Sequence, residues 1–255
     1  LAKGELATTS VMRYYNEVED GSRGNGWYQI DGAEDLDADG DTDWYYVDDG
    51  EIKYADGGYK DEATYDEDGK MVYVQRIKIE GKYFSFNEKG QMQDGLQYCQ
   101  ADGGFYYFDA NGYQKTGRVT SVENDDDDYT FYFNTKNGKN GQGYTGEKSG
   151  YLYWNGKRLE ADDDYRIYVV GEKYYLVNNK GKLQKSTSKE YDVENFGDDV
   201  KFTFRNTYEI ASSTKDGSEG TYKNAATLPK IELFDNAIYQ DALGVTHYEN
   251  TDAYE

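Results

Sequence analysis

Residues that usually build chemical sites are scarce in this chain of 255 residues, which contains one cysteine, one histidine and one proline. A single cysteine, Cys99, excludes an internal disulfide framework and a cysteine-rich zinc site. Nucleophile triads need a base, usually histidine. The lone His247 lies near the C-terminus, where we expect a surface or cap position. Nucleophile-elbow, phosphate-loop and zinc-protease motifs are also missing. We therefore expect a non-catalytic protein.

Long hydrophobic runs and an excess of basic residues are missing as well. No run approaches the ~18 apolar residues needed to span a membrane. Lys and Arg number 28 against 50 Asp and Glu, a formal net charge of −22. Because binding to a phosphate backbone requires a basic patch, we expect neither nucleic-acid binding nor membrane insertion. The sequence starts at Leu1 without a signal-peptide pattern, so we expect a piece cut from a longer precursor.

Aromatic residues are abundant: the chain has 29 Tyr, 10 Phe and 3 Trp. A mean hydropathy of −1.02 taken alone would suggest disorder, but disordered chains are poor in aromatics. Tyrosine and tryptophan bury a large flat face while keeping a polar tip for water or a hydrogen bond. This composition favours a folded chain with a thin, ring-rich core.

The aromatic residues recur in one pattern, clearest at Gly103–Gln114, where an aromatic run leads into Asn111-Gly112 and a second short segment. Asn-Gly between apolar runs predicts a β-hairpin with a type I′ turn, which needs positive φ at both central residues. Similar turn glycines recur along the chain at steps of 18 to 26 residues. They are Gly50, Gly69, Gly90, Gly112, Gly138, Gly156 and Gly181.

This periodicity predicts the fold class. A single hairpin is marginal alone, but stacked hairpins bury a shared interior. We expect an all-β solenoid of stacked β-hairpins, built from aromatic repeats of ~20 residues, with non-repeat capping segments at both ends. The expected divisions are an N-terminal cap or leader segment (1–25), the hairpin array (26–190) and degenerate C-terminal repeats or a β cap (191–255). Within the last segment, Val200–Phe204 alternates with period two and predicts a strand.

One acidic stretch matches part of a calcium loop, which places acidic ligands at positions one, three, five and nine and glycine at six. The matching residues are Asp35, Asp37, Asp39, Gly40 and Asp43. Position twelve is Tyr46, where a bidentate glutamate belongs, and no amphipathic helices flank the stretch. Two interpretations stay open, a calcium site and a solvated acidic turn. No other cofactor is expected.

The pattern Gly-x-aromatic-Tyr-Tyr-Phe-Asp-x-x-Gly-x-Met resembles the cell-wall-binding repeats of Gram-positive surface proteins, a family that includes choline-binding modules and related glucan-binding repeats. It is carried here by Gly103–Gln114, Gly81–Met92 and Asp43–Ile52. The resemblance covers roughly Trp27 to Gln184, with several degenerate copies. It implies a hairpin solenoid at the extracellular face of the cell wall, with ligands between successive hairpins. The implied partners are cell-wall teichoic acid, choline or polysaccharide, and possible further partners are host glycans or proteins.

In the choline-binding members, a quaternary ammonium sits among aromatic rings: a Trp from a Gly-Trp step, an aromatic of the next hairpin and a nearby Met. Each good cation–π contact contributes about 0.5–2 kcal/mol. In this chain only Gly26-Trp27 keeps the step, with Trp44 as its neighbour. The resemblance thus implies one cage near these two residues, and a structural role for both is the alternative.

Sugars bind by different physics, stacking their apolar faces on exposed rings beside polar groups. The aromatic candidates for either ligand are Trp27, Trp44, Tyr45, Tyr83, Phe105, Tyr106, Tyr151, Trp154 and Tyr174. We expect a surface module that binds a cell-wall polymer or glycan through aromatic grooves between repeats. The alternative is a structural spacer or adhesin stalk that binds no small ligand. Two or more exposed aromatics converging at a repeat junction would weaken the alternative.

Overall fold

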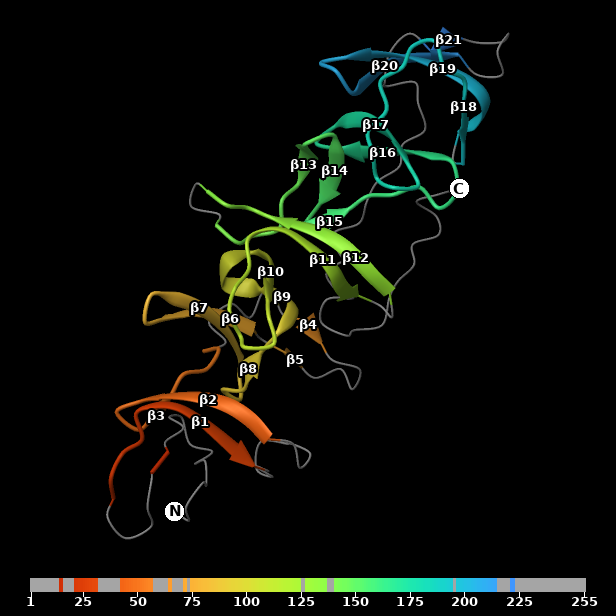
Figure 1. The fold of residues 1–255 in the computed structure, drawn as a ribbon. Helices are drawn as coiled ribbons and strands as arrows, with labels where there is room; N and C mark the ends of the chain where they lie inside the picture. The colour runs from red at the N-terminus through yellow and green to blue at the C-terminus, as the bar shows by residue number, and fades with distance from the viewer. Residues whose placement is uncertain are drawn as a thin grey trace. The chain divides into compact units, whose positions relative to one another are not determined.

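The computed structural model describes residues 14–15, 21–31, 42–56, 64–65, 71–72, 74–124, 127–136, 140–194, 196–214 and 221–222. These residues form two compact units, one ending at Lys115 and the other beginning at Thr116. In the described part of the chain, the short 3₁₀ turn η3 (Gln100–Asp102) is the sole helical element, and strands make up the rest of the regular structure (Figure 1). The prediction of an all-β fold of repeated hairpins is confirmed.

The first unit consists of small antiparallel sheets whose strands are neighbours in the sequence. Their order is β1-β2-β3, β4-β5, β6-β7-β8 and β10-β9. The strands are β1 (Gly26–Asp31), β2 (Thr42–Asp48), β3 (Glu51–Ile52), β4 (Thr64–Tyr65), β5 (Met71–Val72), β6 (Val74–Ile79), β7 (Lys82–Asn87), β8 (Met92–Gln93), β9 (Gly95–Cys99) and β10 (Gly104–Phe108).

The second unit holds two larger sheets, ordered β11-β12-β15-β14-β13 and β17-β16-β18-β19-β20-β21. The strands of the first are β11 (Gly117–Asn124), β12 (Asp127–Phe133), β13 (Gly146–Lys148), β14 (Tyr151–Trp154) and β15 (Lys157–Arg158). The strands of the second are β16 (Tyr165–Val170), β17 (Lys173–Asn178), β18 (Tyr191–Val193), β19 (Gly197–Arg205), β20 (Glu209–Thr214) and β21 (Thr221–Tyr222). The predicted strand at Val200–Phe204 lies within β19 and is confirmed.

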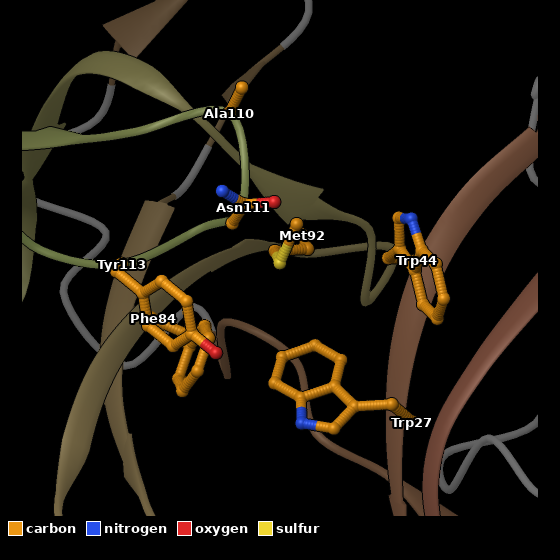
Figure 2. A pocket seen from close by; sticks show the side chains of 7 residues that line it. All are labelled: Trp27, Trp44, Phe84, Met92, Ala110, Asn111 and Tyr113. Carbon is orange, nitrogen blue, oxygen red and sulfur yellow. The ribbon is translucent and has the colours of Figure 1, made fainter.

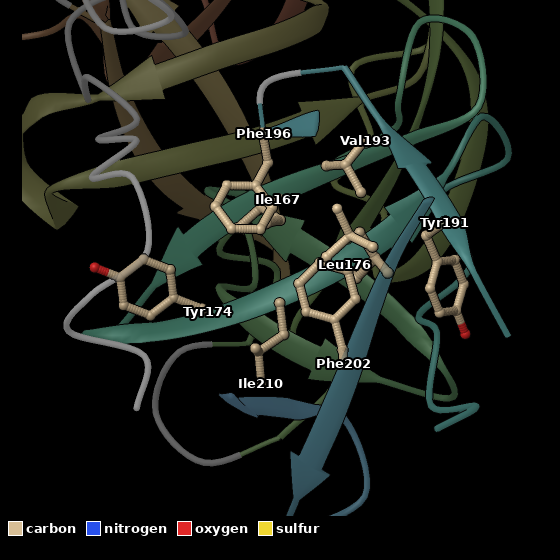
Figure 3. Packing of buried hydrophobic residues seen from close by; sticks show 9 residues of the cluster. Ile167, Tyr174, Leu176, Tyr191, Val193, Phe196, Phe202 and Ile210 are labelled. Atoms are coloured by element: carbon tan, nitrogen blue, oxygen red, sulfur yellow. The ribbon is translucent and has the colours of Figure 1, made fainter. Parts of the chain in front are cut away.

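The C-terminal sheet departs from simple hairpin repetition. β16 and β18 pair in parallel, and a further pairing of β17 with β20 joins five of the strands into a closed ring. The side chains inside it form the largest hydrophobic cluster described, and Figure 3 shows their rings and branched side chains meeting between the strands. The cluster contains Ile167, Tyr174, Leu176, Tyr191, Val193, Phe196, Val200, Phe202 and Ile210. Strands on both sides of residue 190 therefore share one core.

Two kinds of turn connect the strands. Two-residue loops with positive φ at both positions close several hairpins, among them Asp49-Gly50 and Asn155-Gly156, as the turn chemistry predicts. At Asn111-Gly112 the type I′ prediction is wrong, because only Gly112 has positive φ. Gly69 and Gly138 lie outside the described residues.

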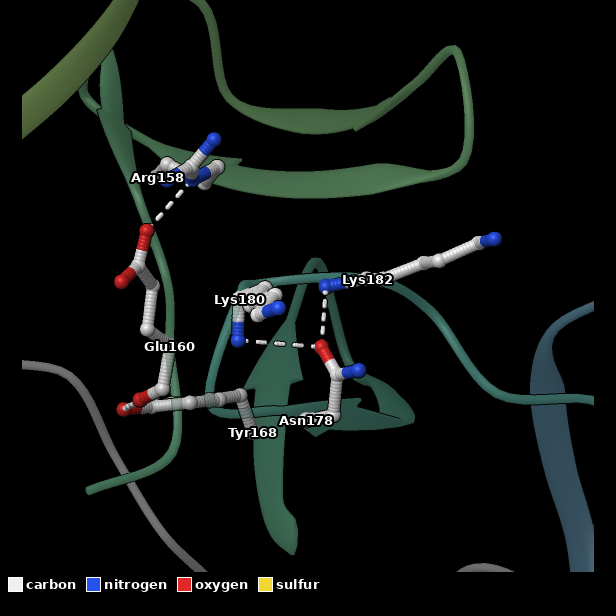
Figure 4. A network of polar contacts seen from close by, with 6 residues as sticks. All are labelled: Arg158, Glu160, Tyr168, Asn178, Lys180 and Lys182. Atoms are coloured by element: carbon white, nitrogen blue, oxygen red, sulfur yellow. Dashed lines mark hydrogen bonds and ion pairs between the residues drawn. The ribbon is translucent and has the colours of Figure 1, made fainter. Parts of the chain in front are cut away.

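The turn at Gly112 belongs to a second kind, found three times among the described residues, with Asp or Asn at its first position and glycine at its fourth. Asp109 Oδ1 accepts hydrogen bonds from the backbone N–H groups of Asn111 and Tyr113, both at 3.0 Å. Asn87 and Asn178 make the same pair of bonds at their own turns. Figure 4 shows the bonds from Lys180 and Lys182 to Asn178. The side-chain oxygen replaces a backbone acceptor, which fixes each turn locally.

Candidate ligand-binding site

The first hairpin has two aromatic faces because successive residues of a strand point to opposite sides. Trp27 pairs with Tyr46 across the β1–β2 ladder, and Trp44 pairs with Gln29, so both tryptophans share one face. The intervening residues turn to the other face and enter a hydrophobic cluster. That cluster contains Tyr14, Ile30, Tyr45, Val47 and Ile52. The alternation thus leaves Trp27 and Trp44 for contacts outside the hairpin's own core.

Trp27 joins this hairpin to the β6–β8 sheet. Its ring centroid lies 4.6 Å from that of Phe84 and 5.9 Å from that of Phe86, with the second pair stacked at an interplanar angle of 19°. On its own hairpin it meets Tyr46 edge-on at 5.2 Å. Met92 of β8 packs against the same cluster. A single half-buried indole therefore holds two hairpins together and forms the floor of the space between them.

The space between the first hairpin and the β6–β8 sheet has the turn that follows β10 as its third wall. Tyr113 lies with its ring centroid 5.4 Å from that of Phe84. Gly112 has φ +76°, and a Cβ at this position would overlap the sulfur of Met92 and crowd Phe84. Only glycine allows the turn to approach β7 and β8 so closely. The close approach places Ala110, Asn111 and Tyr113 opposite the two tryptophans.

These three walls enclose a cavity of about 340 Å³ (Figure 2). In Figure 2 the rings of Trp27, Trp44, Phe84 and Tyr113 lie around the space together with the Met92 side chain. Its lining consists of Trp27, Trp44, Phe84, Met92, Ala110, Asn111 and Tyr113. Trp44 is 42% exposed and Tyr113 is 38% exposed, and they are the two exposed large hydrophobic side chains in the described part of the chain. Both border the same cavity.

The lining is almost free of charge. None of its described residues is acidic or basic, and Asn111 carries the one side-chain amide. Charges lie at the margins: Gln91 donates a hydrogen bond to Asp43, which precedes Trp44, with 2.7 Å between Nε2 and Oδ2. Lys82 Nζ lies 4.2 Å from the ring centroid of Tyr113. Burial, with a smaller contribution from the charge of Asp43, raises the pKa of Tyr45 to about 12. The cavity can therefore take an apolar or cationic group against ring faces.

The structure brings together two of the nine aromatic candidates, Trp27 and Trp44. Four others are buried and offer no face to a ligand, namely Tyr45, Phe105, Tyr106 and Tyr174. The remaining three are half-buried elsewhere: Tyr83 beneath Arg76, Tyr151 beside Arg158, and Trp154 against a hydrophobic cluster that contains Leu152. Sequence reasoning identified the aromatic runs. It did not identify which alternate residues of each strand point inward, and this decides which aromatic side chains are exposed.

Five lining residues were missed by sequence reasoning: Phe84, Met92, Ala110, Asn111 and Tyr113. Signals for two of them were present. Met92 occupies the Met position of the repeat pattern two residues after Gly90, and Tyr113 follows the turn glycine Gly112 directly. Their approach to the first hairpin depends on packing between repeats, which the pattern alone does not specify.

The possible calcium site stays a prediction. Asp35, Asp37 and Asp39 lie outside the described residues, as does His247. Asp43 lies on β2 and accepts the hydrogen bond from Gln91. Where the chain is described, no three His, Cys, Asp or Glu side chains are grouped so as to hold a metal ion. Nor does that part of the chain contain a helix long and apolar enough to cross a membrane.

Comparison with known proteins adds solved structures only, since no family model and no curated protein matches the chain. Choline binding protein F of Streptococcus pneumoniae has 21% sequence identity over 82% of this chain, with a TM-score of 0.43. The chain is similar to choline-binding proteins. It spans 57% of the length of choline binding protein F.

Two further structures are similar to the chain. CbpJ from S. pneumoniae TIGR4 has 14% identity, with 86% of this chain and 92% of CbpJ covered and a TM-score of 0.35. A truncated alternansucrase from Leuconostoc mesenteroides has 20% identity, with 61% of this chain and 13% of the enzyme covered and a TM-score of 0.28. Structures similar to the chain thus include members of the family that its repeats resemble.

Proposed function

We propose that the chain is a non-catalytic module of the bacterial surface that binds a cell-wall polymer. The polymer's quaternary ammonium groups would enter the cavity between the β1–β3 and β6–β8 sheets. The observation that carries this proposal is the convergence of Trp44 and Tyr113, the two exposed large hydrophobic side chains described, on one cavity floored by Trp27. Exposing two such rings costs hydrophobic burial, and their placement beside a hollow indicates use rather than chance.

A methylated ammonium suits this lining better than a sugar. Ring faces attract a cation through their negative quadrupole, and the methyl groups gain apolar contact with rings and with the Met92 thioether. A sugar needs several fixed polar partners, whereas the lining supplies one side-chain amide, that of Asn111. The formal charge of −22 also favours the approach of cations over that of anions. The cell-wall polymer is the partner that the repeat resemblance implies.

The same lining supports a non-catalytic role. General acid–base catalysis needs a titratable group within hydrogen-bond reach of the reacting atoms. Tyr113 is the one titratable residue among the described residues of the lining. With one histidine in the sequence and no charged group in the cavity, binding is the chemistry that these residues can perform.

The experiment compares the binding of choline and tetramethylammonium to the intact chain and to Trp44→Ala by titration calorimetry. Since each cation–π contact contributes about 0.5–2 kcal/mol, Trp44→Ala should weaken binding about tenfold. Its unfolding temperature should change little, because the side chain is 42% exposed.

Trp154→Phe, in the second unit, is the matched control and should leave the affinity unchanged. A wild-type chain that binds neither cation, nor isolated teichoic acid, peptidoglycan or glucan, would remove the proposal and favour the stalk alternative. If the chain binds glucan and none of the other ligands, the ligand of the cavity is a sugar stacked on the rings and not an ammonium group.

A further inference from the structure

A second aromatic arrangement in the first unit already holds a cation. Arg76 of β6 places its guanidinium carbon 4.2 Å from the ring centroid of Tyr83 and 4.2 Å from that of Tyr106. Tyr83 belongs to β7 and Tyr106 to β10, so the two rings come from different sheets. Both distances fall well inside the roughly 6 Å within which a cation is attracted to a ring face.

The guanidinium is also held by hydrogen bonds. Asp102 accepts two of them, from Nε at 3.0 Å and from a terminal nitrogen at 3.1 Å, and the other terminal nitrogen donates to Gln114 Oε1 at 2.8 Å. The Arg76 side chain is 10% exposed. Burial opposes its charge, but the hydrogen bond and charge of Asp102 outweigh this and raise the pKa of Arg76. Two rings, one carboxylate and one amide thus surround a single planar cation.

We propose that Tyr83, Tyr106, Asp102 and Gln114 form a cation-binding cage whose occupant is the chain's own Arg76. The cage accepts small planar or methylated cations, of the guanidinium or tetramethylammonium class, once the arginine side chain is removed. In the intact chain it is closed to external ligands, and it joins the β6–β8 sheet to the β9–β10 hairpin. This inference does not depend on the function proposed above.

The contrast with the open cavity supports this assignment. Arg158 lies 5.5 Å from the ring centroid of Tyr151, and so the chain's own cations face three of the sequence-predicted ligand rings. Over Trp27, Trp44 and Phe84 the described part of the chain places no lysine or arginine. The fourth ring of the cavity lining, that of Tyr113, has the exposed Lys82 Nζ 4.2 Å from its centroid. The cage thus differs from the open cavity in that its cation, Arg76, is buried between two rings.

The only cysteine of the sequence reports on this cage. Cys99 is fully buried and packs in one cluster with Val74, Tyr106 and Phe108. It lies close enough to Asp102 and Arg76 for their charges to act on it, and burial followed by the charge of Asp102 raises the pKa of the Cys99 thiol. A buried, protonated thiol reacts slowly. Because Tyr106 contacts both Arg76 and this cluster, we expect removal of Arg76 to raise the access of solvent to the Cys99 thiol and a cation bound in the empty cage to lower it again.

The experiment measures the rate at which a thiol reagent labels Cys99 in Arg76→Ala. We expect labelling about tenfold faster than in the wild type, because local opening limits access to buried groups. Millimolar methylguanidinium or tetramethylammonium should slow it again in a saturable way. Arg158→Ala is the matched control: it removes an arginine beside one ring in the second unit, so its labelling rate should stay at the wild-type value and ignore both cations.

If Arg76→Ala does not fold, it is refolded with methylguanidinium, and Asp102→Asn is added to remove the carboxylate charge that faced Arg76. Recovery of folded protein that depends on the cation supports the cage. The proposal is overturned if neither cation slows the labelling of Cys99 in a folded variant. It is also overturned if none of these variants refolds in the presence of methylguanidinium. Repeating the measurement with Trp44→Ala present separates this result from binding in the open cavity.

Discussion

At the residue scale, one carboxylate shapes the wall of the open cavity. Asp109 begins the turn that carries Ala110, Asn111 and Tyr113, and it accepts backbone hydrogen bonds from the last two. Lys115 Nζ lies 2.6 Å from Asp109 Oδ2. Partial burial alone would raise the pKa of Asp109. The hydrogen bonds from Lys115 and from the two backbone groups outweigh burial and lower this pKa below its ordinary value of 3.8.

This shift predicts how stability responds to pH. A carboxyl group whose pKa is lower in the folded state stabilises the fold above its unfolded pKa, and the contribution is lost as pH falls through the folded pKa. The wild type should therefore exceed Asp109→Asn in unfolding temperature by a constant margin from pH 5 to pH 8, and the margin should shrink below about pH 3.8. Thermal unfolding followed by circular dichroism at a series of pH values measures it.

Asp109→Asn is expected to fold, because Asn87 and Asn178 make the same backbone bonds at the equivalent turns. A margin that stays unchanged down to pH 2 would show that the Asp109 charge adds nothing to stability.

At the scale of elements, the turns are what the sequence predicts best. Asp49-Gly50 and Asn155-Gly156 close hairpins through positive φ at both positions, as their composition requires. Asn111-Gly112 looks the same in sequence, yet the backbone N–H of Asn111 donates a hydrogen bond to Asp109 Oδ1, and Asn111 does not have positive φ. The competing acceptor two residues earlier decided the outcome, and turn dipeptides alone do not reveal it.

The turn glycines also allow a test of packing between elements. Gly112→Ala carries the backbone cost of positive φ and also forces a Cβ into Met92. Gly81→Ala carries only the backbone cost, because nothing lies within 4 Å of its Cβ position at φ +86°. We expect Gly81→Ala to cost about 1 kcal/mol and Gly112→Ala about 1–3 kcal/mol more through overpacking. Urea unfolding of both variants measures the difference, and equal losses would contradict the close approach of this turn to β8.

The candidate site was only partly predictable from the sequence. Gly26-Trp27 and Trp44 carry a recognisable signal, and both line the cavity. Tyr45, next to Trp44, has the same composition signal but points into the hairpin's core. Strand phase separates the two, and it is set by which face meets Tyr14 and Ile52. Arg76 carried no sequence signal as the occupant of a ring pair, since its rings lie 7 and 30 positions away.

At the scale of the whole molecule, hairpin repetition gives way to a different architecture. Among the described strands of the first unit, each pairs with a strand that is its neighbour in the sequence. In the second unit, the parallel pairing of β16 with β18 and the return of β20 to β17 close a ring around one core. Local turn signals specify hairpins, whereas pairing across longer stretches depends on burial of the ring's interior, which the repeat pattern does not encode.

The open cavity and the occupied cage show that similar aromatic hairpins differ in what fills the space between their rings. In one place the chain fills the space between rings with Arg76, and in another it leaves Trp27, Trp44 and Tyr113 around a hollow. Repeats that resemble one another in sequence can therefore either fill the space between their rings or leave it open. Arg76 is buried between its two rings, whereas Lys82, which lies over the Tyr113 ring, is exposed and leaves the cavity open.

The most direct measurement is a crystal structure of the intact chain grown with tetramethylammonium or choline. We predict a cation enclosed by the rings of Trp27, Trp44 and Tyr113 above the Met92 thioether, with Arg76 still between Tyr83 and Tyr106. A structure in which this cavity stays empty at saturating cation, or in which the Trp44 and Tyr113 rings close it by packing on each other, would contradict the account.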